Sequence, residues 1–205
     1  MVKEALVVPR DILFEERQFE GFLSLEKHDF RPMILAHHSY ALRTDALEHD
    51  LSLKQIIPYL VIVNLHLKKV FVYRRAGQGK NNESRLWNKW SCGVGGHIEP
   101  QDDDDPLQEA AIRELREEVT MKIYPVPRIV GFVNDEVGDV EKYHFGVIAL
   151  AETEEEDISL GDGEIAEGKF MSVEEVERVF SDPQNQVECW TLLVFPFIKE
   201  YLQSL

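Results

Sequence analysis

The chain has 205 residues, of which 44% are apolar and 29% charged, a composition that excludes a disordered or collagen-like protein. Its formal net charge of −16, from 22 basic and 38 acidic residues, disfavours nucleic acid polymers and anionic membranes as partners. There is no apolar run of roughly 18 residues, no signal-peptide core, and no cysteine besides Cys92 and Cys189, so we expect a cytosolic protein without disulfides or a membrane span.

Residues 1–56 match no pattern that we can name, and we expect an N-terminal extension that is partly strand, beginning with an apolar run at 5–8. This segment holds several of the seven histidines: His28, His37, His38 and His49. No pair among these four has the i, i+4 spacing of a zinc-binding helix. We therefore do not expect these histidines to bind a metal.

Two strands are predicted next, over 59–64 and 70–75, joined by a turn. Seven basic residues lie between positions 68 and 89 of this otherwise acidic chain, and Arg74 and Arg85 are among them. These basic residues are candidates for contact with an anionic ligand. An equally good explanation is that they keep the exposed edge of a β-hairpin soluble.

A helix is predicted from Asp105, as the N-cap carboxylate, to about Val119. On it, Glu114, Glu117 and Glu118 stand at i, i+3 and i+4 and therefore share one face. Three carboxylates on one face repel one another, and on the helix alone they would be interpreted as a solvated surface.

The loop in front of this helix changes that interpretation. Gly93, Gly95 and Gly96 allow the backbone to turn sharply and to approach a ligand closely. A glycine-rich loop beside three carboxylates offers hard oxygen ligands and leaves positions open for water and phosphate. This combination predicts a site for Mg²⁺ or Mn²⁺.

Strands are predicted again over 128–135 and 142–152, and the second is so continuously apolar that we expect it to be buried on both faces. Ser172, followed three residues later by a glutamate, is a capping-box signature that predicts a short helix. Residues 187–205 predict a C-terminal helix.

The segment over about 95–121 resembles the Nudix box, G-x5-E-x7-R-E-U-x-E-E-x-G-U, where U is aliphatic. The core of that motif stands here as Arg-Glu-Leu-Arg-Glu-Glu at 113–118, with the paired glycines upstream. The resemblance implies an α+β fold, an α/β/α sandwich with a mixed central sheet, over residues 57–205. Residues 1–56 would then be an extension of that domain.

The sequence departs from the box in three places. Gly96 to Arg113 spans 17 positions rather than 14, so the intervening loop carries about three extra residues. Counting back from Arg113 puts Asp105 in the place of the first glutamate, with Asp104 as an alternative. Thr120 stands where the box has its last glycine. None of these changes removes a carboxylate that metal binding needs.

The resemblance also implies roles for individual residues. Glu114, Glu117 and Glu118 would bind divalent metal, with Glu114 alternatively acting as a base. The carbonyl oxygen of Gly95 would complete the metal shell, and Arg113 would orient the ligands.

Further residues are assigned around this centre by the same resemblance. One more acid from a distal loop would serve as metal ligand or base, and Glu164 and Glu167 are the candidates. Apart from the resemblance, the glycine loop and the basic residues at 68–89 supply the candidates for substrate contact, which are Gly96, Arg74 and Arg85.

The activity implied by the resemblance is that of a Mg²⁺- or Mn²⁺-dependent hydrolase, which uses a metal-activated water to cleave a diphosphate linkage. Its substrate would be a nucleoside diphosphate joined to another moiety X, and homodimers are common in the family. Two alternatives stay open: an isopentenyl-diphosphate isomerase-like enzyme that uses Cys92, and a Nudix-fold binding module without turnover. The sequence does not identify the individual substrate, because specificity within one fold depends on its loops.

Overall fold

The computed structural model describes residues 3–76, 86–102, 104–160 and 165–205. Its strands are β1 (Glu4–Pro9), β2 (Gly21–Ser24), β3 (Ser39–Leu42), β4 (Leu53–Asn64), β5 (Lys69–Arg75), β6 (Trp90–Ser91), β7 (Gly93–Val94), β8 (Val119–Thr120), β9 (Arg128–Asn134), β10 (His144–Thr153), β11 (Ser159–Leu160) and β12 (Ile165–Met171). Its α-helices are α1 (Arg10–Leu13), α2 (Arg31–His37), α3 (Pro106–Glu118), α4 (Val173–Ser181) and α5 (Cys189–Ser204), and short 3₁₀ turns are η1 (Leu47–His49) and η3 (Glu141–Tyr143).

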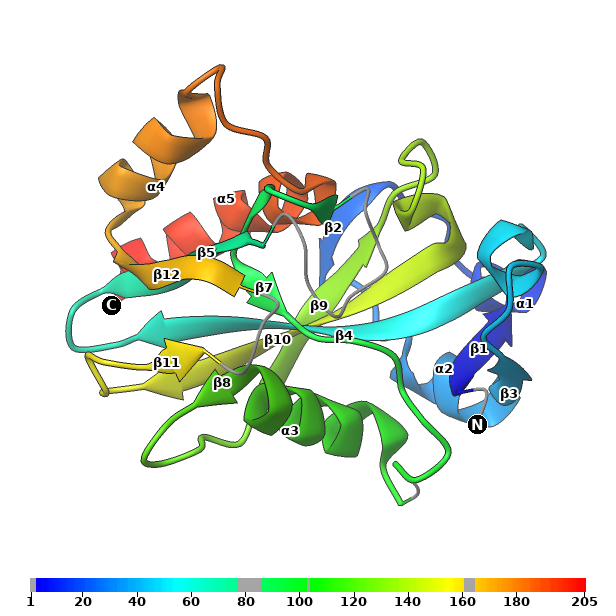
Figure 1. The fold of residues 1–205 in the computed structure, drawn as a ribbon. Coiled ribbons are helices and arrows are strands. Elements are labelled where there is room, and N and C mark those ends of the chain that lie inside the picture. The colour runs from blue at the N-terminus through cyan, green and yellow to red at the C-terminus, as the bar shows by residue number, and fades with distance from the viewer. Residues whose placement is uncertain (1–2, 77–85, 103, 161–164) are drawn as a thin grey trace.

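A mixed sheet forms the middle of the molecule, with the main strand order β12-β5-β4-β10-β9-β2. Helix α3 covers one face of this sheet, and α4 and α5 cover the other (Figure 1). This arrangement is the α/β/α sandwich with a mixed central sheet that we predicted. Of the helices in the described ranges, none is long and apolar enough to cross a membrane.

The two central strands, β4 and β10, run parallel in unbroken register over ten residue pairs. Strands β5 and β9 flank this pair in antiparallel orientation. Both central strands are buried at almost every position, as expected for a parallel pair that is covered on both faces. The strands predicted over 59–64 and 142–152 are thereby confirmed, although β4 begins earlier, at Leu53.

Helix α3 forms where the sequence predicts it. Asp105 is its N-cap, and the side-chain oxygen accepts a hydrogen bond from the backbone N–H of Gln108 at 3.2 Å. Ala111 and Leu115 are buried in a cluster with Leu60 of β4 and other residues of the sheet. This apolar stripe fixes the rotation of the helix, and therefore decides which of its acids faces the glycine loop.

The C-terminal helices also follow the prediction. At the start of α4, the side-chain oxygen of Ser172 accepts from the N–H of Glu175 at 3.3 Å, and the Glu175 carboxylate accepts from the N–H of Ser172 at 2.8 Å. Helix α5 continues through Pro196 and buries Val194 and Ile198 against the sheet.

Residues 3–56 contribute strands to the same sheet. Strand β1 pairs antiparallel with the beginning of β4, and β2 pairs antiparallel with β9. Phe14, Phe19 and Phe30 of this segment each pack edge-on against Phe145 of β10. The segment is thus built into the fold, and it brings η1 beside the start of β10.

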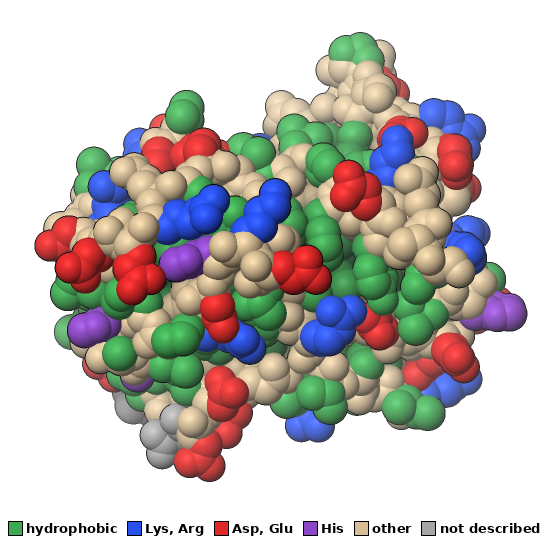
Figure 2. Space-filling view, turned by 180° about the vertical axis from the view of Figure 1, so that it is seen from behind, with side chains coloured by type: hydrophobic (Ala, Val, Ile, Leu, Met, Phe, Trp, Pro, Cys, Tyr) green, Lys and Arg blue, Asp and Glu red, His purple; other side chains and the backbone are tan. Residues whose placement is uncertain are grey.

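Basic and acidic side chains are mixed on one face of the molecule (Figure 2). On the face seen in Figure 2, lysine and arginine side chains lie among aspartates and glutamates. Exposed ion pairs such as Arg128 with Glu152, at 2.7 Å, contribute about 0–1 kcal/mol each. Such ion pairs neutralise part of the negative charge of the chain locally.

Candidate active site

The loop between β7 and α3 requires its paired glycines. Gly95 has a φ of +153°, and a Cβ there would lie 1.9 Å from the carbonyl oxygen of Pro58. A Cβ on Gly96 would lie 2.8 Å from both carboxylate oxygens of Glu114. The loop backbone therefore lies directly against the Glu114 carboxylate, which would have to shift to admit a larger residue at position 96.

Glu114 is almost buried, with 6% of its surface exposed. The Nη1 of Arg113 donates to its Oε1 at 2.7 Å. Burial raises the pKa of Glu114, Arg113 counteracts this shift, and the charges of Glu117 and Glu99 raise it again. A bound cation would stabilise the charged form of such a carboxylate.

Arg113 connects the helix to the glycine loop. Its Nε and Nη2 donate to the two carboxylate oxygens of Asp102 at 3.1 and 2.9 Å, and Nη2 also donates to the carbonyl oxygen of His97 at 2.9 Å. Burial works to lower the pKa of Arg113, but its hydrogen bond to Asp102 and the charge of Glu114 raise that pKa overall. Arg113 is therefore a permanent cation that positions the acids around it.

The acid that contacts Arg113 is Asp102, whereas we expected Asp105 to stand in the place of the first glutamate of the box. Asp105 instead caps α3. Counting forward from Gly96 through the G-x5-E spacing reaches Asp102, so the extra loop residues follow this acid instead of preceding it. Counting back from Arg113 failed because it ran across the insertion.

Two more acids lie close to this centre. The Glu117 side chain is 59% exposed, and its Oε2 lies 3.4 Å from Nη1 of Arg113. Glu99, which sequence reasoning did not single out, pairs with Lys3 at 3.0 Å, and its backbone N–H donates to Asp102 at 2.9 Å. The structure thus gathers Glu99, Glu114 and Glu117 around one arginine.

Glu118 lies one helical turn beyond Glu114 and is half-buried. Its charge acts on Tyr73 of β5, whose hydroxyl donates to the carbonyl oxygen of Gly93 at 2.7 Å. The last acid of the predicted triad is therefore close enough to Tyr73 for its charge to add to the raised pKa of that hydroxyl, which is due mainly to burial.

Arg74 is not brought to this centre. Tyr73 packs in the cluster that contains α3, whereas Val72 packs in the cluster that contains α4 and α5. Side chains alternate along a strand, so Arg74 shares the face of Val72, and it pairs there with Glu167 at 3.7 Å. This position argues against the substrate contact that we expected of Arg74. Two other predicted residues, Arg85 and Glu164, lie outside the described residues.

Cys92 belongs to the core, with 2% of its surface exposed. Its backbone N–H donates to the hydroxyl of Thr191 at 3.1 Å. Burial raises the pKa of the Cys92 thiol to about 12. A buried thiol that stays protonated at neutral pH is a poor catalytic group, which argues against the isomerase alternative.

The fold and the site together describe a mixed sheet between helices, with a glycine loop that lies against the acids of one helix. Comparison with known proteins gives the family. The family model described as NUDIX domain matches residues 57–190. Protein YmaB of Bacillus subtilis (strain 168) is 31% identical over 204 residues, which cover 95% of this chain and 96% of YmaB.

Solved structures agree with this match. Tm1382, described as a candidate Nudix hydrolase, has 25% identity and a TM-score of 0.70, with 97% of this chain and 100% of that chain covered. The NUDIX domain of NrtR from Shewanella oneidensis, solved with ADP ribose, is similar in fold alone. It has 17% identity and a TM-score of 0.56, with 73% of this chain and 88% of that chain covered.

The chain therefore belongs to the Nudix family. It is a Nudix-type pyrophosphohydrolase, an enzyme that acts on phosphorus-containing anhydrides, and hydrolases of this family use divalent metal ions. The resemblance inferred from the box is confirmed in spite of the inserted loop residues.

Proposed function

We propose that this enzyme is a Mg²⁺- or Mn²⁺-dependent hydrolase of a nucleoside diphosphate joined to another moiety X. The observation that carries the proposal is the buried Glu114 carboxylate, which lies against the backbone of Gly96 and beside two other acids. Oxygen donors crowded in this way suit hard divalent cations, which also bind phosphate oxygens.

Glu114, Glu117 and Glu118, with the carbonyl oxygen of Gly95, would hold the metal. A bound divalent ion would neutralise diphosphate oxygens and lower the pKa of an attacking water. Arg113 would keep Glu114 in place, because it donates to that carboxylate and is itself held by Asp102. Charge and positioning dominate such chemistry, so no side chain has to act as nucleophile.

We propose two candidates for the base that takes a proton from the attacking water. Glu164, on the segment that leads into β12, is the first candidate. Glu114 is the second, because its carboxylate lies directly against the glycine loop.

The substrate class is proposed from the fold relatives. The NUDIX domain of NrtR was solved with ADP ribose, which is a nucleoside diphosphate joined to a sugar. Both cysteines of the present chain are free thiols, which suits an enzyme that works in a reducing cytosol.

The test is hydrolysis of a panel of nucleoside diphosphate derivatives, followed by chromatography of the released nucleotides. We expect turnover of at least one member with Mg²⁺ or Mn²⁺, loss of that turnover with excess chelator, and recovery when the metal is restored. If no member is cleaved in the presence of either metal, the binding-module alternative is favoured over the hydrolase.

Replacement of Cys92 by alanine separates the hydrolase from an isomerase. We expect C92A to keep most of its diphosphate hydrolysis, because the thiol is buried and protonated. The measurement is turnover of the panel substrate beside a direct assay of isopentenyl diphosphate isomerisation. An isomerase activity in the wild-type protein that disappears in C92A would replace our proposal.

A further inference from the structure

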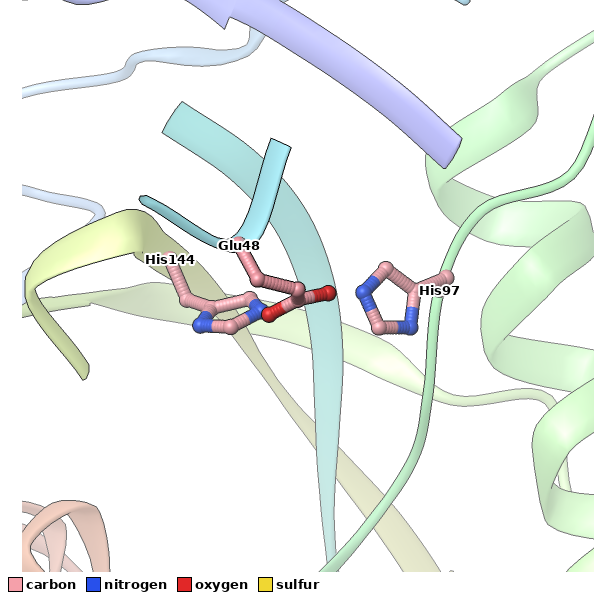
Figure 3. Close-up of side chains that lie close together, drawn as sticks. All are labelled: Glu48, His97 and His144. Atoms are coloured by element: carbon pink, nitrogen blue, oxygen red, sulfur yellow. The ribbon is translucent and has the colours of Figure 1, made fainter. Parts of the chain in front are cut away.

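A second group of metal-ligating side chains lies apart from the acids of the box. Glu48 of η1, His97 of the glycine loop and His144 of β10 each offer one ligand atom, and these atoms all lie within 4.8 Å of one another. Figure 3 shows the Glu48 carboxylate between the two imidazole rings, with a ring nitrogen of each turned toward it. The fold thus gathers residues that are 49 and 47 positions apart in the sequence.

His144 is oriented for ligation by its backbone contact. Its Nδ1 lies 2.7 Å from the carbonyl oxygen of Val140. A carbonyl oxygen can only accept, so Nδ1 carries the proton and Nε2 keeps a free lone pair. Metal-binding histidines are commonly held in this way, with one ring nitrogen donating to a carbonyl group and the other facing the ion.

His97 is held on the other side of the carboxylate. Its Nε2 lies 2.8 Å from Oε1 of Gln55, and its backbone carbonyl oxygen accepts from Arg113. An amide oxygen only accepts, so Nε2 of His97 carries the proton in this hydrogen bond. A metal ion bound at Nε2 would displace that proton, and the Gln55 oxygen would have to turn away from the ring.

We propose that Glu48, His97 and His144 form a site for a transition-metal ion of the Zn²⁺ class, separate from the carboxylate site of the box. Two imidazoles and one carboxylate are a ligand set of protein zinc sites that leave one position open to water. Imidazole nitrogen favours Zn²⁺, Co²⁺ and Ni²⁺ over Mg²⁺. The three ligand atoms would have to move about 1 Å closer together to reach the bond lengths of zinc.

The donor set points to the same class of metal. The cluster offers a single carboxylate, from Glu48, beside the two imidazoles. Mg²⁺ binds through oxygen ligands, so this donor set disfavours it.

The site also gives the N-terminal segment a role. Glu48 comes from that segment, whereas His97 lies next to Gly96 in the loop that faces Glu114. An ion bound here would tie the segment to the loop and so restrain the loop backbone. The proposal does not depend on the activity or substrate of the carboxylate site.

The test uses metal-free full-length protein titrated with Co²⁺, whose visible d–d absorption reports nitrogen ligation and low coordination number. We expect one strongly absorbing Co²⁺ site, from which Zn²⁺ displaces the ion. The variants E48Q and H144A should each weaken binding by roughly tenfold or more. The controls are E118Q, which removes an acid of the box, and H66A, which removes an exposed histidine. Both should keep the absorption.

Absence of this absorption in the wild-type protein overturns the proposal, and so does an undiminished signal in E48Q. Glutamine keeps the size of Glu48, so E48Q decides the matter even if H144A, which empties a buried position, fails to fold by circular dichroism. Loss of the signal in E118Q would assign the ion to the acids of the box, and that result also overturns it. The readout is metal binding rather than turnover, so failure here and failure of the proposed hydrolase are distinguishable.

Discussion

Replacing Glu118 by glutamine is expected to lower kcat by several orders of magnitude while the protein stays folded. The substitution keeps the side-chain shape and removes one negative charge from the carboxylates that would hold the metal. Loss of an outer-shell partner of a metal costs roughly 10–100-fold, and loss of a ligand should cost more. Steady-state hydrolysis of the best panel substrate, with Mg²⁺ varied, measures this effect.

Glu109→Gln is the matched control for this experiment. Glu109 lies in the first turn of the same helix and is not one of the acids at 114, 117 and 118. It undergoes the same change of charge, and we expect turnover close to that of the wild-type protein. A folded E118Q protein with near-normal turnover would contradict the assignment of Glu118 to the metal.

Replacing Asp102 by asparagine is expected to lower kcat by roughly 10–100-fold, the usual effect of losing a residue that orients a metal ligand. Asp102 is 3% exposed and accepts two charge-assisted hydrogen bonds from Arg113. A neutral amide leaves the guanidinium partly unpaired, so Arg113 no longer holds Glu114 firmly. We also expect a loss of about 1.5–3 kcal/mol in the free energy of unfolding, measured by urea denaturation.

Asp105→Asn provides the comparison that separates the two aspartates. Asparagine is as good an N-cap as aspartate, so the free energy of unfolding should change by only a few tenths of a kcal/mol. Asp105 makes no contact with Arg113 that would affect turnover, because its oxygen caps the helix. A D105N enzyme that loses activity while D102N retains it would restore our original assignment of the loop acid.

The two proposed metal sites differ in chemistry although they share the glycine loop. The carboxylate site offers oxygen ligands and negative charge, which suit Mg²⁺ or Mn²⁺. The histidine cluster offers two imidazole nitrogens and one carboxylate, a donor set that suits Zn²⁺. His97 joins them, because its backbone carbonyl contacts Arg113 while its ring faces Glu48.

The local sequence determined the secondary-structure elements and most of the Nudix box. Asp105 and the following proline predicted the start of α3, and Ser172 predicted the start of α4, because capping depends on residues only a few positions apart. The apolar run at 142–152 predicted a strand buried on both faces for the same local reason. The helical spacing of Glu114, Glu117 and Glu118 likewise followed from the geometry of a single helix.

Only the tertiary structure decided which groups meet across the fold. Asp102 rather than Asp105 reaches Arg113, because the path of an inserted loop depends on what it packs against. Cys92, between β6 and β7, is buried because residues of α5 such as Thr191 and Trp190 pack over it, and no local sequence pattern predicts that contact. Glu48, His97 and His144 meet because the N-terminal segment joins the central sheet. Such contacts join residues dozens of positions apart, and packing rather than spacing brings them together.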